Sequence, residues 1–283
     1  MKFKMKAVLC GVMAAAMMAV AGCGGGGDAQ KQAGSVAAAP QGKLMQQIKQ
    51  KGVLVVGTAS GYPPYEFVDT SQGDKKVIGV DMEFAQKVAD KLGVKLQVQD
   101  MNFQALLTSL MSGKVDLAIA GINPTDERRK TMDFSNNYLP TAQKIMIRKE
   151  DAGKLKTIDD FKGLTLGVQK STTQETVAKA EIPDAKIVAL NHVPDVVLEV
   201  KNHKVDGLVV EGIVGQQYLD FNDDLTFSDA VFKNGTKNSA VALQKGNEDL
   251  LKVINEVIKE NTDNGNYEKW VKEYGAKAMA NAK

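Results

Sequence analysis

The sequence predicts an α/β protein of two similarly built lobes, each a mostly parallel sheet flanked by helices. Strand and helix patterns alternate along the chain, an order typical of parallel sheets. One pattern occurs twice, at residues 110–121 and 198–212: a helix end, then Lys-Val-Asp, then a buried strand. Two extended segments, 141–148 and 238–243, would cross between the halves. Two crossings favour lobes joined by a double hinge, with one continuous sheet as the alternative.

The first 22 residues are typical of a lipoprotein signal peptide. Three lysines within the first six residues precede an apolar run at 7–20, which is too short to span a bilayer stably. The next residues, Val20-Ala21-Gly22-Cys23, resemble the bacterial lipobox, where the peptidase cuts before cysteine and the thiol takes a diacylglyceryl group. This implies that acyl chains such as palmitate on Cys23 anchor the protein to the membrane. The alternative is an ordinary signal peptide and a free Cys23.

Composition and charge are typical of a globular protein that binds no nucleic acid. The 283 residues are 43% hydrophobic and 25% charged, and the formal net charge of +2 approaches zero without the N-terminal lysines. Residues 23–42 are rich in Gly, Ala and Gln and predict a flexible linker. Cys10 leaves with the signal peptide, so no disulfide is expected. We expect a monomer outside the cytoplasm, held at the cell membrane by its lipid anchor.

Residues 43–141 and 241–283 are predicted to form the first lobe. Its expected elements are helices at 43–51, 82–92, 102–113, 247–261 and 267–274, and strands at 53–58, 95–98 and 115–120. In open parallel sheets, ligands bind beyond the carboxyl ends of the strands. Tyr62, Phe103 and the segment 121–128 all follow such ends. Two adjacent prolines in the loop that carries Tyr62 would hold this side chain rigidly.

A candidate anion site lies where the third predicted strand meets a short helix. Thr125 is a good N-cap for this helix, whose N-terminus favours negative charge. Arg128 lies one turn further on and can grip a carboxylate with its planar fork. We predict that backbone N–H groups, Asn123 and Arg128 hold a small anion. The alternative is a surface Arg128 paired with Asp126 or Glu127.

Residues 142–240 are predicted to form the second lobe. Strands are expected at 164–168, 186–190 and 205–210, and helices after Thr172 and at 194–201. Thr172 to Glu175 is a capping-box pattern that opens a second helix N-terminus. Glu211 follows the last strand and suits a cation, unless it is merely a solvated acid. An arginine, two helix N-termini and an acid together suit a zwitterion in a dry cleft.

Signatures of enzymes and metal sites are scarce. His192 and His203 are the only histidines, and they have no metal-ligand spacing. The sequence contains neither a Gly-x-Ser-x-Gly elbow nor a Gly-rich phosphate loop. We therefore expect no catalytic residue, no metal and no cofactor.

Several short motifs carry a resemblance to a known family. They are Val56-Gly57-Thr58, Tyr62-Pro63-Pro64-Tyr65-Glu66-Phe67, Gly79-Val80-Asp81, Ser112-Gly113-Lys114-Val115-Asp116, residues 125–129, Phe134-Ser135, Phe161-Lys162-Gly163 and Thr172-Thr173. From about residue 51 to 274, the chain resembles the polar amino-acid-binding proteins of bacterial ABC importers, solute-binding protein family 3. The resemblance implies a type II periplasmic-binding-protein fold that closes around one L-amino acid. It also implies an ABC permease and ATPase as partners.

The resemblance further implies which residues touch the ligand. Arg128 would hold the α-carboxylate with N–H groups near Asn123 and Thr173. Glu211 would take the α-ammonium, where the family usually has the shorter aspartate. The other implied contacts are Tyr62 and Phe103 beside the ligand side chain, backbone groups of Ala120 and Gly121, and Gln169, Ser171 and Thr172 from the second lobe.

The nature of the ligand side chain is less defined. Family members that select basic amino acids often have an acid near the position of Ala59, which is apolar here, although Glu66 or another acid could substitute. We therefore expect a polar or general L-amino acid. Two other functions stay open: an enzyme similar to cyclohexadienyl dehydratases, with Glu211 as general acid, and a surface lipoprotein that senses a ligand.

Overall fold

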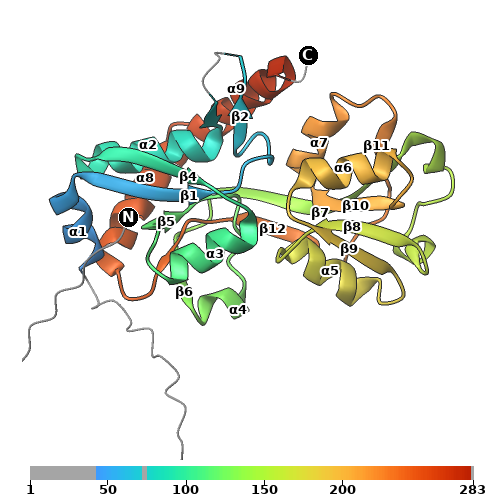
Figure 1. Cartoon of the computed structure of the whole chain (residues 1–283), viewed down its shortest axis with the longest axis horizontal. Helices are drawn as coiled ribbons and strands as arrows, with labels where there is room; N and C mark the ends of the chain where they lie inside the picture. Colours follow the sequence, from blue (N-terminus) through green and yellow to red (C-terminus); the bar gives the residue numbers. More distant parts are fainter. Residues whose placement is uncertain (1–42, 72–74, 282–283) are drawn as a thin grey trace, which may run out of the picture. The chain divides into compact units, whose positions relative to one another are not determined.

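Two mixed β-sheets with flanking helices dominate the computed structural model, which describes residues 43–71 and 75–281 (Figure 1). The helices are α1 Leu44–Lys51, α2 Val80–Leu92, α3 Phe103–Met111, α4 Asp126–Arg129, α5 Thr173–Glu181, α6 Val193–Lys201, α7 Gly212–Leu219, α8 Glu248–Asp263 and α9 Asn266–Asn281, with 3-10 turns η1 Lys149–Asp151 and η2 Ile158–Phe161. The strands are β1 Val53–Thr58, β2 Phe67–Asp69, β3 Lys76–Ile78, β4 Lys95–Asp100, β5 Leu117–Ala118, β6 Met132–Phe134, β7 Leu139–Arg148, β8 Thr165–Gln169, β9 Lys186–Leu190, β10 Gly207–Glu211, β11 Leu225–Phe227, β12 Thr236–Ser239 and β13 Ala242–Gln244. The predicted α/β class is confirmed. The predicted signal peptide and linker, including Cys23, lie outside the described residues.

The first sheet has the strand order β4-β1-β5-β13-β6. β1 pairs in parallel with β4 and β5, as expected, whereas β13 is antiparallel to both β5 and β6. The sheet is therefore mixed, because a strand from late in the chain enters between two early ones. Side chains of β1 alternate between its faces: Leu54 and Val56 share a core with Phe84 of α2, and Val55 packs with Leu106 of α3.

The second sheet repeats this plan. Its order is β11-β7-β10-β8-β9, with β12 paired to β7. β8, β9 and β10 are parallel, and the pairs formed by β7 are antiparallel. On β10, Leu208 packs in a core with Val196 of α6, and Val209 packs on the other face with Ala178 of α5. Each sheet thus presents the carboxyl ends of three parallel strands, where polar side chains can gather.

Two neighbouring strands connect the sheets. The chain leaves the first sheet along β7 and returns along β12, which pairs antiparallel with the first residues of β7. The predicted crossing at 141–148 lies within β7. The predicted return at 238–243 is divided between β12 and β13, because Ala240 and Val241 separate two short strands. This pairing brings β12, a polar strand, beside the ends of β5 and β10.

The repeated Val-Asp pattern has one structural purpose in both sheets. The Asp116 carboxylate accepts a hydrogen bond from the N–H of Val55 in β1 at 2.7 Å, and Asp206 accepts one from Thr165 in β8 at 2.8 Å. The backbone N–H of each aspartate donates to a carbonyl of the same neighbouring strand, of Val55 and Thr165 respectively. Each aspartate therefore ties the start of β5 or β10 to the neighbouring parallel strand, β1 or β8.

Several local predictions need correction. The apolar run 115–120 contains only the two-residue strand β5, and the short hairpin β2–β3 was not predicted. The Glu175 carboxylate accepts from the N–H of Ser171 rather than from Thr172, the N-cap, so the capping box is incomplete. Among the described helices, none is long and apolar enough to cross a membrane.

Candidate functional site

A small cavity lies beyond the carboxyl ends of β1, β5 and β8. Its walls are formed by Ala59, Tyr62, Glu66, Phe103, Ala120, Gly121, Asn123, Arg128, Gln169, Thr172, Thr173, Gln174 and Lys237. The cavity volume is about 10 Å³, near the minimum for one water molecule. The walls must therefore move apart before anything as large as an amino acid can enter.

Most of the residues predicted to contact a ligand gather around this cavity. Those that line it are Tyr62, Phe103, Ala120, Gly121, Asn123, Arg128, Gln169, Thr172 and Thr173. Ser171 does not line it; with Arg128 and Thr173, it lines a neighbouring surface groove. Glu211 does not line it either, because its carboxylate is held behind Tyr62. The structure thus brings together residues more than 100 positions apart in the sequence.

Arg128 forms the cationic end of the cavity. Thr125 caps α4 by accepting a hydrogen bond from the N–H of Arg128 at 3.2 Å, which fixes the start of the helix as predicted. The guanidinium donates to the backbone carbonyls of Asn123 at 2.8 Å and Ser171 at 3.1 Å. Burial, with no acid contributing, lowers the Arg128 pKa to about 10, so the group stays charged at neutral pH.

The predicted alternative for this arginine, pairing with a neighbouring acid, is wrong. Glu127 is exposed and pairs with Lys130 at 2.5 Å. Both hydrogen bonds that the Arg128 guanidinium donates go to neutral backbone carbonyls. Since a guanidinium binds a carboxylate more strongly than it binds a carbonyl, Arg128 is suited to hold an incoming anion.

The N-terminus of α5 faces the same cavity. Thr172 caps this helix, accepting from the N–H of Glu175 at 3.3 Å, and Thr173 and Gln174 line the cavity. Within the described residues, no hydrogen bond uses the backbone N–H groups of Thr173 and Gln174. Helix N-termini with free N–H groups favour anions. Together with Arg128, this end of the cavity suits a carboxylate.

Aromatic rings cover two sides of the cavity. The Phe103 ring lies under Arg128, with the guanidinium carbon 5.2 Å from its centre. Tyr62 stacks on Tyr65 with ring centres 5.8 Å apart. Phe103 and Tyr62 are both almost completely buried. They belong to apolar cores as well as to the cavity wall, so each ring both packs in a core and lines the cavity.

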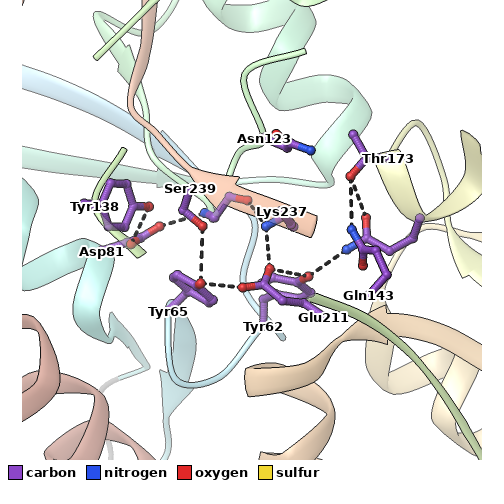
Figure 2. Close-up of polar contacts among 12 residues, drawn as sticks. Tyr62, Tyr65, Asp81, Asn123, Tyr138, Gln143, Thr173, Glu211, Lys237 and Ser239 are labelled. Carbon is purple, nitrogen blue, oxygen red and sulfur yellow. Dashed lines mark hydrogen bonds and ion pairs between the residues drawn. The ribbon is translucent and has the colours of Figure 1, made fainter. Parts of the chain in front are cut away.

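Glu211 occupies an unexpected environment. Its side chain is completely buried at the end of β10. Tyr62 and Tyr65 donate their hydroxyls to the carboxylate, and Lys237 of β12 forms an ion pair with it (Figure 2). The Tyr62 hydroxyl also accepts a hydrogen bond from Gln174 at 3.0 Å. We predicted an acid that faces a ligand; the structure has one that is already neutralised by a lysine.

The backbone N–H and carbonyl of Gly121 also have hydrogen-bond partners within the protein. Its N–H donates to Asp81 at 2.8 Å, and its carbonyl accepts from the Lys237 ammonium. Its φ of +51° lies in the left-handed region, and an added Cβ would lie 3.3 Å from the Tyr62 ring and 3.6 Å from Lys237 Nζ. The backbone conformation therefore favours glycine here, and an added Cβ would also press on the Tyr62 ring.

A pair of buried acids, Glu66 and Asp81, lies behind Tyr62 and Tyr65. The carboxyl groups of Glu66 and Asp81 are hydrogen-bonded to each other, and Tyr138 donates to Asp81 at 2.8 Å. Burial raises the pKa of Glu66 well above its usual range and raises that of Asp81 to about 7.

Sequence reasoning missed Lys237 and Gln174 and gave Glu66 only a possible role. Lys237 lies in a polar strand, and hydrophobic patterns assign such lysines to the surface. The available signal was the two-residue period of β12: Lys237 and Ser239 share the buried face, whereas Thr236 is exposed. Within the described residues, no group of His, Cys, Asp or Glu side chains is arranged to bind a metal.

Known proteins match this chain over most of its length. Residues 54–277 match the model of the family described as bacterial extracellular solute-binding proteins, family 3. The arginine-binding extracellular protein ArtP of Bacillus subtilis is 38% identical over 229 residues, 79% of this chain and 86% of ArtP. The L-cystine-binding protein TcyJ of Escherichia coli is 32% identical over 233 residues, 80% of this chain and 85% of TcyJ.

A solved structure shares the fold. It is the amino acid ABC transporter substrate-binding protein AbpA from Streptococcus pneumoniae, bound to L-arginine. Its TM-score is 0.80 at 31% sequence identity, and the match covers 82% of this chain and 98% of that chain. The type II periplasmic-binding-protein fold expected from the sequence is thus confirmed.

Proposed function

Because this chain belongs to family 3 of the bacterial extracellular solute-binding proteins, we propose that it captures one polar L-amino acid for an ABC importer. The amino acid binds between two lobes, and the loaded protein delivers it to a permease and ATPase complex in the membrane. Matched relatives that bind arginine and cystine support an amino acid as the ligand.

One observation carries the proposal: Arg128 lines a small cavity without an acidic partner among the described residues. A carboxylate at this point exchanges two neutral carbonyl contacts for a charge-assisted pair. The unused N–H groups of Thr173 and Gln174 at the start of α5 provide further donors. These features suit the α-carboxylate, the group that all L-amino acids share.

The remaining contacts follow from the cavity wall. Tyr62 and Phe103 flank the ligand side chain, and Asn123 lies near its carboxylate. Ala120, Gly121, Gln169, Ser171 and Thr172 complete the shell as the lobes close. Glu211 takes the α-ammonium once Tyr62 and Lys237 make room for it. All are within or directly behind the cavity wall, except Ser171, which contacts Arg128.

Binding requires the two lobes to separate and close. The proposed lobes are residues 43–141 with 241–283, and residues 142–240, hinged at the paired strands β7 and β12. Several contacts join them directly, including Arg128 to Ser171 and Tyr62 to Glu211. A cavity of about 10 Å³ admits an amino acid only after such contacts break, so the hinge is part of the binding mechanism.

The ligand is best identified by a thermal-shift screen of the twenty L-amino acids and L-cystine, followed by calorimetry. We expect one or a few of them to raise the midpoint of thermal unfolding, because a ligand bound only by the folded state stabilises it. The amine that corresponds to each amino acid but lacks its carboxylate serves as the control and should not change the midpoint. If no amino acid shifts the midpoint, or if the amines shift it equally, the proposal fails.

We propose no enzymatic activity. A dehydratase needs a general acid that reaches its substrate, whereas the Glu211 carboxylate is held by two tyrosines and a lysine behind the cavity wall. Aromatic product formed from arogenate or prephenate would contradict this. The protein is also proposed to be anchored outside the cytoplasm through Cys23, which lies in the part of the sequence that the structure does not describe.

A further inference from the structure

Lys237 places a positive charge in the wall of the cavity, close to where a ligand ammonium is expected. Its ammonium group forms an ion pair with Glu211 and donates to the carbonyl of Gly121 (Figure 2). The side chain is 3% exposed. Its Nζ also lies 5.9 Å and 5.8 Å from the ring centres of Tyr62 and Tyr65. An ammonium held this way has most of its coordination filled by the protein itself.

The two groups that bind Lys237 are those proposed to bind the ligand. Glu211 is the proposed acceptor for the α-ammonium, and Gly121 is a proposed backbone contact. The single negative charge of Glu211 balances only one ammonium, and the carboxylate already accepts hydrogen bonds from Tyr62 and Tyr65, so a second buried cation beside it would stay unneutralised. One cation has to leave when the other arrives.

A second acceptor for Lys237 lies close by. Glu66 and Asp81 share a hydrogen bond and together act on Lys237 electrostatically. Glu66 lines the cavity, is 1% exposed, and its Oε2 has no hydrogen-bond partner among the described residues. A buried carboxyl oxygen without a partner is costly, so a cation that moves toward it gains an interaction.

We propose that Lys237 is an internal competitor for the ligand's α-ammonium and sets the affinity of the site for amino acids. When the ligand ammonium binds Glu211, Lys237 moves to the Glu66–Asp81 pair. This inference rests on the proposed function, since it concerns the ammonium half of the same site.

The charges balance in both arrangements. Without ligand, Lys237 neutralises Glu211, and the Glu66–Asp81 pair, whose pKa values are both raised by burial, keeps at least one proton. With ligand, the α-ammonium neutralises Glu211, and Lys237 neutralises the pair. Lys237 favours the form of the pair that carries one negative charge, because its positive charge lowers the pKa of both acids. The other titratable groups around Lys237 are the buried hydroxyls of Tyr62, Tyr65 and Tyr138, whose pKa values burial raises well above their usual range, so they stay neutral.

The test uses the variant Lys237→Met and three pairs of probes. Each pair is an L-amino acid and the same acid without its α-amino group: arginine and 5-guanidinopentanoate, histidine and imidazolepropionate, cystine and 3,3′-dithiodipropionate. Calorimetry should show that Lys237→Met binds at least one of the three amino acids about tenfold more tightly than the wild-type protein does. The acids without an amino group should show no such gain, because they do not compete with Lys237.

Two further variants keep the test decisive. Lys245→Met removes a half-exposed lysine of the same returning segment and should leave every affinity unchanged. Glu66→Gln should weaken amino-acid binding in the wild-type background but not in Lys237→Met, because its partner has gone. If Lys237→Met unfolds, Glu66→Gln with the three probe pairs still tests the proposal: equal weakening of the amino acids and their des-amino analogues would overturn it.

The outcomes separate this inference from the proposed function. If the wild-type protein binds an amino acid and Lys237→Met binds it equally or more weakly, Lys237 is a structural or ligand-contacting residue and the inference is wrong. If neither protein binds any of the three amino acids, while the thermal-shift screen also finds no ligand, the proposed function and this inference both fail.

Discussion

The guanidinium of Arg128 donates to the backbone carbonyl of Ser171, 3.1 Å away and 43 residues later in the chain. Ser171 has a φ of +66°, a conformation uncommon outside glycine. The contact joins α4 to the segment just before α5, across the cavity. A ligand carboxylate that reaches Arg128 replaces this neutral acceptor with a charged one. The Arg128 side chain therefore takes part both in ligand binding and in the contact between the two segments.

Phe103 is expected to strengthen the carboxylate end of the site. Its ring lies 5.2 Å from the guanidinium carbon of Arg128, and such cation–π contacts contribute about 0.5–2 kcal/mol. Replacing Phe103 with Leu keeps most of the apolar volume and removes the ring. We predict a loss of affinity of about twofold to thirtyfold by calorimetry. Affinity equal to that of the wild-type protein would show that Phe103 only packs.

The two strand-clamping aspartates allow a matched test of stability. Asp116 accepts from Val55 N–H and from Lys51 and is almost fully buried, whereas Asp206 accepts from Thr165 N–H and is more exposed. Asp116→Ala leaves a buried N–H without its partner and should cost about 1–3 kcal/mol of unfolding free energy in urea. Asp206→Ala should cost less. Equal costs, or a larger cost at Asp206, would contradict the burial argument.

Asp81 predicts a pH dependence of stability. Burial raises its pKa from 3.8 to about 7, so the folded protein retains a proton that the unfolded chain loses at lower pH. The free energy of unfolding should therefore decrease as pH rises from about 4 to about 7, by a few kcal/mol at most. Urea titrations across this range should show a smaller decrease for Asp81→Asn. Asp263→Asn, an exposed control, should behave like wild type; an unchanged slope for Asp81→Asn would contradict the prediction.

Cys23 is predicted to carry the lipid anchor. Expressed in a bacterium with its signal peptide, the wild-type protein should fractionate with membranes and incorporate labelled palmitate. Cys23→Ser should lose the label and appear in the soluble fraction, because no acyl chain then holds it. Cys10→Ser is the matched control, since Cys10 belongs to the segment that is removed. Membrane retention of Cys23→Ser would refute the anchor.

The fold was predictable where its signals are local. Thr125 caps α4 through the N–H of Arg128 as expected, and the strands β1, β8 and β9 lie within about one residue of their predicted bounds. The antiparallel placement of β13 was not predictable, because it depends on pairing with β5 and β6, more than 100 residues earlier. Strand order is a long-range property that periodicity does not contain.

The site likewise has residues that local sequence predicts and residues that depend on long-range contacts. Arg128 and the start of α5 could be predicted because their signals are local. Thr125 caps the helix that carries Arg128, and Thr172 caps α5. The environment of Glu211 could not, since the acid meets Lys237 from another strand and two tyrosine hydroxyls from the loop after β1. A buried lysine in a polar strand has no hydrophobic signature, and only the folded chain shows its partner.

Calorimetry on Arg128→Ala tests the central claim, that Arg128 holds the ligand's carboxylate, most directly. The amino acid found in the thermal-shift screen should bind this variant at least tenfold more weakly than the wild-type protein, since losing the charged partner of a desolvated carboxylate costs about 2–5 kcal/mol. Arg129→Ala, which removes an exposed guanidinium beside Phe134, should retain wild-type affinity. Unchanged affinity in Arg128→Ala would contradict the account.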